Sequence, residues 1–148
     1  MVDADLETAG STDPAVLALV TAQQDELAER YGEEDTLVEL NQDIEFLVLR
    51  TAGEAIGCVG LQPVSGLVGE VKRMYVVPAH RGRGLSRRLL SAIEERARAL
   101  GLTSLRLETG VKQPEAIALY SRSGYREIPR YVPYEENALS VCFAKDLG

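Results

Sequence analysis

Three segments carry apolar residues at the three-to-four-residue spacing of a helix buried along one side: residues 14–31, 85–100 and 114–123. Asp13 and Pro14 supply the start signal of the first helix, because aspartate can cap free amides and proline fits the first turn. A glycine stands where each helix should end: Gly32, Gly101 and Gly124. The pattern predicts three helices with defined ends.

Six further segments have the apolar pattern of strands: residues 45–50, 55–64, 67–77, 104–109, 125–128 and 139–145. Short turns at residues 51–54 and 65–66 join the first three strands, which predicts an antiparallel meander. The acidic stretch 32–43 fits either a short helix or a loop. The order of elements predicts one α/β or α+β domain.

The composition is that of an ordinary soluble domain, with 45% hydrophobic and 26% charged residues in a chain of 148. No run approaches the roughly 18 consecutive apolar residues of a membrane-spanning helix, and the acidic first residues do not resemble a targeting signal. We therefore expect a cytoplasmic protein that does not enter the membrane. Cys58 and Cys142 lie in apolar stretches without metal-ligand spacing, which predicts buried free thiols and no metal site.

Charge is distributed unevenly along the chain. The formal net charge of -7 argues against a nucleic-acid-binding protein, because attraction to phosphates is the main sequence-independent part of such binding. Thirteen acidic residues and a single arginine precede residue 46. In contrast, the segment between Glu70 and Glu94 contains six basic residues and no acidic residue: Lys72, Arg73, Arg81, Arg83, Arg87 and Arg88. This cationic segment indicates either a small polyanionic ligand or a solvated basic face.

A glycine-rich loop within residues 70–90 connects a predicted strand directly to a predicted helix. The first turn of a helix leaves backbone N–H groups unpaired at the positive end of the helix dipole, so a pyrophosphate placed there gains hydrogen bonds. Gly82 and Gly84 permit close approach of such a ligand. The loop lacks the GK[ST] ending of a P-loop and the third glycine of a dinucleotide-binding fingerprint, which excludes both of those sites.

The same loop resembles the pyrophosphate-binding motif of the GNAT superfamily of acyl-CoA-dependent N-acetyltransferases. Arg81, Gly84 and Ser86 occupy the defined positions of Q/R-x-x-G-x-G/A, with serine in place of the last glycine or alanine. A second family pattern, LY-x-x-x-G-F/Y, is matched by Leu119, Tyr120, Gly124 and Tyr125. The resemblance implies a single N-acetyltransferase domain over residues 1–148, with a central mixed, mostly antiparallel twisted sheet flanked by helices and with acetyl-CoA as co-substrate.

The resemblance also assigns a surface for the coenzyme. In the family, the loop and helix start bind the pyrophosphate, and the preceding strand pairs with the pantetheine chain. Gln113 stands where an asparagine often contacts the CoA arm. The residues expected to contact the coenzyme are Met74, Tyr75, Val76, Arg81, Gly82, Arg83, Gly84, Leu85, Ser86, Gln113 and Tyr120.

Acetyl transfer to an amine requires a neutral amine, a stabilised oxyanion and a proton for the departing thiolate. The pKa of a lysine-like amine is about 10.4, so deprotonating the amine at pH 7 costs roughly 4 kcal/mol unless a base takes the proton. Glu70 resembles the base position of the family's histone-acetylating members and would act through a water. The alternative is an ordinary solvent-facing strand carboxylate.

The family typically stabilises the oxyanion with a backbone N–H where the strand diverges from its neighbour, which maps to Met74, while Val76 pairs with the pantetheine. Tyr120 resembles the family's general acid. A phenol that titrates near about 10 protonates a thiolate whose thiol titrates near about 8.5 at an uphill cost of only ~2 kcal/mol. The competing interpretation of Tyr120 is an aromatic residue packed in the core.

Four other residues lie near the expected cleft. We interpret His80, the only histidine, as a solvated loop residue. Glu108 is a candidate accessory base or binder of a cationic acceptor, with a capped, exposed carboxylate as the alternative. Tyr131 and Tyr134 lie in a loop that often walls the acceptor site in similar proteins, or they cover the sheet edge.

The sequence predicts an enzyme that transfers the acetyl group of acetyl-CoA directly to a primary amine in a ternary complex, since no residue is placed as an acyl-accepting nucleophile. The alternative is a catalytically silent acyl-CoA-sensing or partner-binding module, which has no reason to keep both Glu70 and Tyr120. The acceptor, a small molecule or a peptide amine, depends on variable loops. The acidic N-terminal third could attract it. A homodimer is common among proteins of similar appearance.

Overall fold

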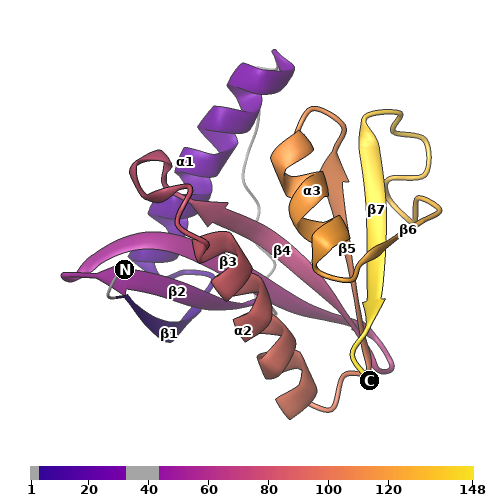
Figure 1. The fold of residues 1–148 in the computed structure, drawn as a ribbon, viewed down its shortest axis with the longest axis horizontal. Coiled ribbons are helices and arrows are strands. Elements are labelled where there is room, and N and C mark those ends of the chain that lie inside the picture. The colour runs from indigo at the N-terminus through magenta and orange to yellow at the C-terminus, as the bar shows by residue number, and fades with distance from the viewer. Residues whose placement is uncertain (1–3, 33–43) are drawn as a thin grey trace.

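Seven strands form one sheet in the order β1-β2-β3-β4-β5-β7-β6 in the computed structural model, which describes residues 4–32 and 44–148. The strands are β1 (Asp5–Gly10), β2 (Glu45–Thr51), β3 (Glu54–Ser65), β4 (Val68–Val76), β5 (Ser104–Gly110), β6 (Arg126–Ile128) and β7 (Ser140–Asp146). The helices are α1 (Pro14–Tyr31), α2 (Leu85–Ala99) and α3 (Pro114–Arg122). Every neighbouring pair of strands is antiparallel except β4 and β5. The expected mixed, mostly antiparallel sheet flanked by helices is confirmed (Figure 1).

Helices cover both faces of the sheet, which divides the core in two. Along β2, alternate residues point to opposite faces, so Phe46 and Val48 pack in the core under α1 while Leu47 and Leu49 pack on the face that α2 covers. This double burial explains the continuous apolar run of β2. Cys58 and Cys142 are buried and free, as the sequence predicts.

The boundary signals of α1 act as predicted. The Asp13 side chain accepts a hydrogen bond from the backbone N–H of Ala15 at 2.8 Å, and Pro14 begins the helix. Gly32 ends it in the left-handed conformation with φ of 68°. The predicted helix or loop over residues 32–43 falls, beyond Gly32, outside the described residues. Within the described part of the chain, no helix is both long and apolar enough to cross a membrane.

Strand β1 corrects the sequence analysis, which placed only a helix before residue 45. It pairs with β2 at the edge of the sheet, from Asp5 opposite Arg50 to Gly10 opposite Glu45. Four of its six residues are exposed, and Leu6 is only half-buried. An edge strand without a fully buried face leaves no apolar alternation in the sequence, so the pattern could not reveal it.

Strands β4 and β5 diverge soon after they meet. Their parallel pairing covers only three positions, from Val68 opposite Ser104 to Glu70 opposite Arg106, although β4 continues to Val76. Figure 1 shows the two strands separating, with α3 beside the open side of the wedge. The divergence exposes one backbone edge of β4 and creates the space for a site.

Candidate active site

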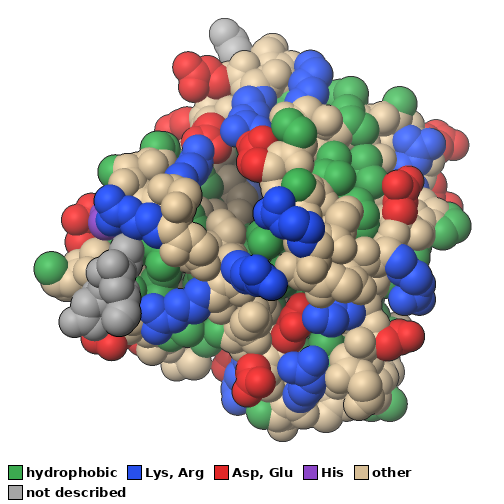
Figure 2. All heavy atoms as spheres, in the orientation of Figure 1, with side chains coloured by type: hydrophobic (Ala, Val, Ile, Leu, Met, Phe, Trp, Pro, Cys, Tyr) green, Lys and Arg blue, Asp and Glu red, His purple; other side chains and the backbone are tan. Residues whose placement is uncertain are grey.

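A cleft with a volume of about 1050 Å³ opens where β4 and β5 diverge. Residues of α1, β4, the start of α2, the end of β5 and α3 line it. Figure 2 shows the hollow between α1 and α3, with Lys and Arg side chains around its rim. All of the residues expected to contact the coenzyme line this cleft except Arg83, which is exposed outside it.

The loop before α2 leaves room for a ligand. Gly82 and Gly84 have φ of 79° and 76°, a region that L-residues with side chains rarely adopt. No atom lies within 4 Å of the position where a Cβ would stand at either glycine. Gly84 caps α2 without a side-chain hydrogen bond, so the first-turn amides remain open to a ligand. Open glycines and uncapped amides fit a diphosphate.

Arg81 anchors this loop to the rest of the molecule. Its Nε donates to the carbonyl of Val76 at 2.9 Å, and its Nη2 donates to both carboxylate oxygens of Glu26, at 2.8 and 3.0 Å. The guanidinium also lies 5.4 Å from the ring centre of Tyr75. Arg81 therefore shares its charge with Glu26 of α1, a contact that the motif did not reveal. Arg87 is exposed on the rim of the cleft.

A β-bulge shapes the open edge of β4. Val59 faces two residues, Arg73 and Met74, because Cys58 pairs with Tyr75 whereas Gly60 pairs with Lys72. Arg73 takes φ of 52°, a left-handed conformation that is unfavourable for an arginine. The carbonyl of Met74 accepts a hydrogen bond from Nε2 of Gln23 on α1 at 3.0 Å. The bulge thus ties the expected oxyanion strand to α1.

Glu70 is buried rather than solvent-facing, so that alternative interpretation is wrong. Its side chain is only 6% exposed. Its Oε1 accepts a hydrogen bond from Nε of Arg106 at 3.0 Å, and its Oε2 pairs with Nζ of Lys72 at 2.5 Å. Glu70 lines the cleft, but both of its oxygens already contact cations.

Glu108 is half-buried beside the cleft rather than exposed, which overturns the alternative interpretation of this residue. The hydroxyl of Ser140 donates to Oε2 of Glu108 at 2.7 Å. Burial raises the pKa of Glu108, and the Ser140 hydrogen bond opposes part of that effect. A carboxylate in this state exchanges protons closer to neutral pH than an exposed one.

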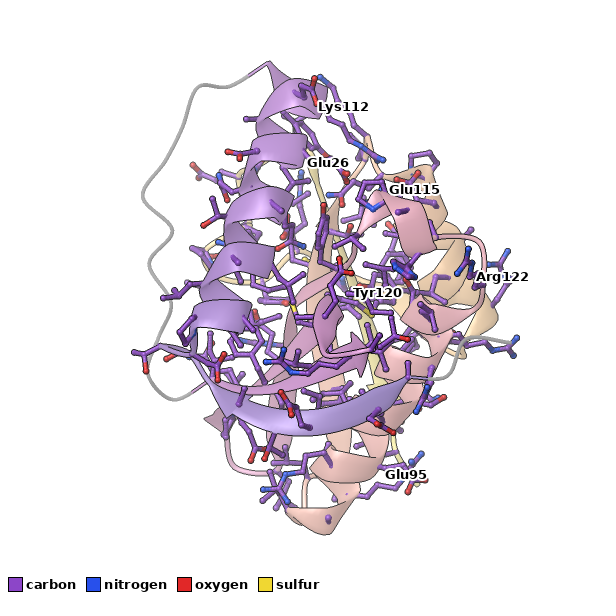
Figure 3. All side chains as sticks on the ribbon, turned by 90° about the vertical axis from the view of Figure 1, so that its left-hand side faces the viewer. Glu26, Glu95, Lys112, Glu115, Tyr120 and Arg122 are labelled. Carbon is purple, nitrogen blue, oxygen red and sulfur yellow. The ribbon has the colours of Figure 1, made fainter. Side chains whose placement is uncertain are left out.

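Tyr120 lies on the cleft wall and is also packed in the core, so its role as a general acid stays a prediction. It lines the cleft, and it also packs in the core with its ring 5.8 Å from Tyr125 and 6.2 Å from Phe143. Burial raises the pKa of Tyr120, so the phenol keeps its proton at neutral pH. Figure 3 shows Tyr120 of α3 near the middle of the view, with Glu26 on α1 and Glu115 at the start of α3.

The two loop tyrosines differ in their position relative to the cleft. Tyr134 lines the cleft, whereas Tyr131 does not. Tyr131 instead lies under the guanidinium of Arg106, 4.0 Å from its ring centre, and packs edge-on against Tyr134. It therefore supports the cation that holds Glu70.

The prediction that His80 is a solvated loop residue is wrong. His80 is half-buried and lines the cleft, and its Nδ1 has no hydrogen-bond partner among the described residues.

The sequence profile of the acetyltransferase (GNAT) family matches residues 15–125. The chain belongs to this family. It is 46% identical over 106 residues to an IAA acetyltransferase of Azospirillum brasilense, covering 71% of this chain and 69% of that one. A Klebsiella pneumoniae protein described as an acyl-CoA N-acyltransferase shares the fold with a TM-score of 0.85 and 37% identity over 98% of both chains. A GNAT acetyltransferase of Elizabethkingia anophelis with acetyl-CoA bound has a TM-score of 0.75 at 18% identity over 97% of both chains.

Helix α1 supplies the part of this GNAT acetyltransferase site that the sequence analysis missed. Gln23, Glu26 and Tyr31 line the cleft, and Arg30 pairs with Glu115 of α3. Polar residues at positions 23, 26 and 30 recur at the three-to-four-residue spacing of one helix face. That polar stripe was the available signal, but a solvated helix face has the same pattern.

Proposed function

We propose that this acetyltransferase transfers an acetyl group from acetyl-CoA directly to a primary amine bound in the same cleft. The supporting observation is the continuous path from the divergent edge of β4 to the uncapped start of α2. A silent acyl-CoA-sensing module would need this path, but it would not need a buried phenol and a partly buried carboxylate on the cleft wall. Those two groups favour catalysis over sensing.

The residues of the cleft suit acetyl-CoA. When bound, acetyl-CoA supplies the acetyl group as a thioester. The first-turn amides of α2 would hold its diphosphate, and Arg87 would add charge at the rim. The backbone N–H of Val77 donates to the carbonyl of Ile56 on β3, so the N–H and C=O of the preceding residue, Val76, point away from β3. Val76 would therefore pair with the pantetheine. The bound acetyl-CoA of the Elizabethkingia protein supports this assignment by fold.

We assign the donation of a proton to the departing thiolate to Tyr120, and the oxyanion contact to the Met74 backbone N–H. Alternation along β4 directs the Met74 backbone to the same edge as that of Val76. Removing such a donor in other enzymes raises the barrier by about 2.7–4 kcal/mol. Neither cysteine lines the cleft, which favours direct transfer over a thioester on the enzyme.

Two carboxylates compete for the role of base. The family resemblance predicts Glu70, but the oxygens of Glu70 contact Arg106 and Lys72. Glu108 accepts only the Ser140 hydrogen bond among the side-chain contacts that the structure describes, and burial raises its pKa. The geometry therefore favours Glu108 as the proton acceptor. Glu70→Gln and Glu108→Gln should separate the two, because only loss of the base removes the acid limb of the pH–rate profile.

The proposal is tested by following CoA release from acetyl-CoA with a panel of primary amines, and by titrating acetyl-CoA into the protein in a calorimeter. We expect saturable binding and amine-dependent release. Binding without release from any amine would favour the sensing module. Absence of binding would overturn the proposal.

A further inference from the structure

We infer that the amine acceptor carries an anionic group, a carboxylate or a phosphonate, a few bonds from its nitrogen, and that Arg73 binds this group. The inference rests on the proposed function, because it names the acceptor class of that same site. The observations that carry it are the position and the partners of Arg73 and Gln23 on the cleft wall.

Arg73 presents a positive charge inside the cleft beside the expected reaction centre. It directly precedes Met74, and the bulge holds its backbone at φ of 52°. Its Nη1 donates to the neutral amide Oε1 of Gln24 at 3.2 Å. Among the described residues no carboxylate forms an ion pair with Arg73, although it is only partly exposed. Burial lowers the pKa of Arg73, an effect that a bound anion would reverse.

The neighbouring charges also favour an anion. Lys72 and Arg106 both pair with Glu70, so this group carries more positive than negative charge. Glu108 interacts with Lys72 and Arg73, but its hydrogen bond comes from Ser140. The described charges at this end of the cleft therefore do not suit an acceptor that bears only positive charge, such as a polyamine.

A separate group is available for the amine. The Nε2 of Gln23 donates to the Met74 carbonyl, which fixes the orientation of the amide. Its Oε1 is buried and has no hydrogen-bond partner among the described residues. An unpaired buried acceptor is unfavourable unless a ligand supplies a donor. Gln23 and Glu108 can thus receive the amine hydrogens while Arg73 receives the anion.

The test compares matched acceptors that differ in one group. Release of CoA from acetyl-CoA is measured with 3-aminopropanoate, 2-aminoethylphosphonate and the uncharged 3-aminopropanamide. We expect the better of the two acidic amines, 3-aminopropanoate or 2-aminoethylphosphonate, to have a kcat/KM at least about tenfold higher than that of 3-aminopropanamide. The reason is that an arginine pairs with an anion through charge-assisted hydrogen bonds. The two acids distinguish a carboxylate site from a phosphonate site.

Variants identify the residue responsible. Arg73→Met should reduce the preference for the acid to about threefold or less, mainly through KM, whereas Arg73→Lys should keep part of it. Arg126→Met, which removes an exposed arginine on β6 outside the cleft, should leave the preference unchanged. Because the preference is a ratio within each variant, partial misfolding does not alter it.

The outcomes separate the two proposals. Equal kcat/KM for the acids and the amide, or an unchanged preference in Arg73→Met, would overturn the inference while leaving the proposed function intact. Failure of all tested amines, including amines without an acid group, would overturn the proposed function and this inference with it.

Discussion

At the level of single residues, the two carboxylates beside the cleft differ in what holds them. Glu70 lies between Arg106 and Lys72, which contact both of its oxygens. Glu108 receives one hydrogen bond from Ser140, and burial raises the pKa of its carboxyl group. We therefore propose that the same residue type serves as a structural anion at position 70 and as the proton acceptor at position 108.

The pH profile should report Glu108. As pH falls, protonation of the base removes activity, and burial places this acid limb above the ordinary glutamate value of about 4.3. The Ser140 hydrogen bond stabilises the ionised form of Glu108. Ser140→Ala should therefore move the acid limb of the kcat/KM pH profile to higher pH by ~0.5–1 unit. Ser65→Ala, at the exposed end of β3, serves as the control. An unmoved limb would exclude Glu108 as the base.

Removing the Tyr120 hydroxyl should affect turnover but not binding. Tyr120→Phe keeps the ring that packs on Phe143, so acetyl-CoA affinity should persist in a calorimetric titration while kcat falls at least about tenfold. The fall reflects loss of the proton donor for the thiolate.

Tyr125→Phe is the matched control, because its hydroxyl donates to buried Glu94 at 2.8 Å rather than facing the cleft. It should lower the free energy of unfolding by about 1 kcal/mol and leave kcat nearly unchanged. Wild-type turnover in Tyr120→Phe would remove this phenol from the mechanism.

At the level of elements, the start of α2 and the bulge of β4 lie on one continuous wall. Gly84 leaves the helix start uncapped, and the left-handed Arg73 redirects the strand edge upstream. Arg81 joins the two features, because it hydrogen-bonds the Val76 carbonyl between them. We therefore expect the loop, the strand and α1, which Arg81 contacts through Glu26, to position a ligand together.

Charge at the start of α2 should control coenzyme affinity. Arg87→Glu places a negative charge on the cleft rim, so the Kd for CoA should rise about tenfold at low salt, with a smaller rise at high salt because of screening. Arg126→Glu changes the net charge equally but lies on β6, away from the cleft, and should alter the Kd little. Equal effects of the two reversals would indicate a general field rather than a local site.

At the level of the whole molecule, α1 is fastened to the segment between β5 and α3 across one end of the cleft. The Tyr31 hydroxyl accepts a hydrogen bond from the Lys112 N–H at 3.2 Å, and Arg30 donates to the Lys112 carbonyl at 3.3 Å. Arg30 also pairs with Glu115. Figure 3 shows Lys112 and Glu115 near the C-terminal end of α1. These contacts join the two halves of the site.

Gly110 makes this fastening possible, because a Cβ there would overlap the Tyr31 hydroxyl. Gly110→Ala should therefore displace Tyr31 and lower the free energy of unfolding in urea by about 1–3 kcal/mol, with a higher KM for the amine. Gly10→Ala is the control, since a Cβ at Gly10 meets no atom within 4 Å. Equal stabilities of the two variants would show that α1 is not held at this point.

Much of this architecture follows from local pattern. Residues such as Leu89 and Ile93 repeat at helical period, Asp13 caps α1, and Gly84 precedes α2, so the helices and the glycine-rich loop were predictable from short stretches. The family motifs around Arg81 and Tyr120 predicted residues that line one cleft in the structure, and their roles there stay predictions. These features depend on neighbours in sequence, which the chain itself specifies.

Other features depend on residues that are far apart in the chain. The edge strand β1 has no buried face to mark it, and the bulge at Arg73 arises from the register with β3. Glu70 and Arg106 are 36 positions apart, and only the pairing of β4 with β5 brings them together. The sequence alone thus determined the motif and, among the described residues, every α-helix and strand except β1. Tertiary structure decided which polar groups are neutralised and which remain available, because burial and partners exist only once the strands are paired.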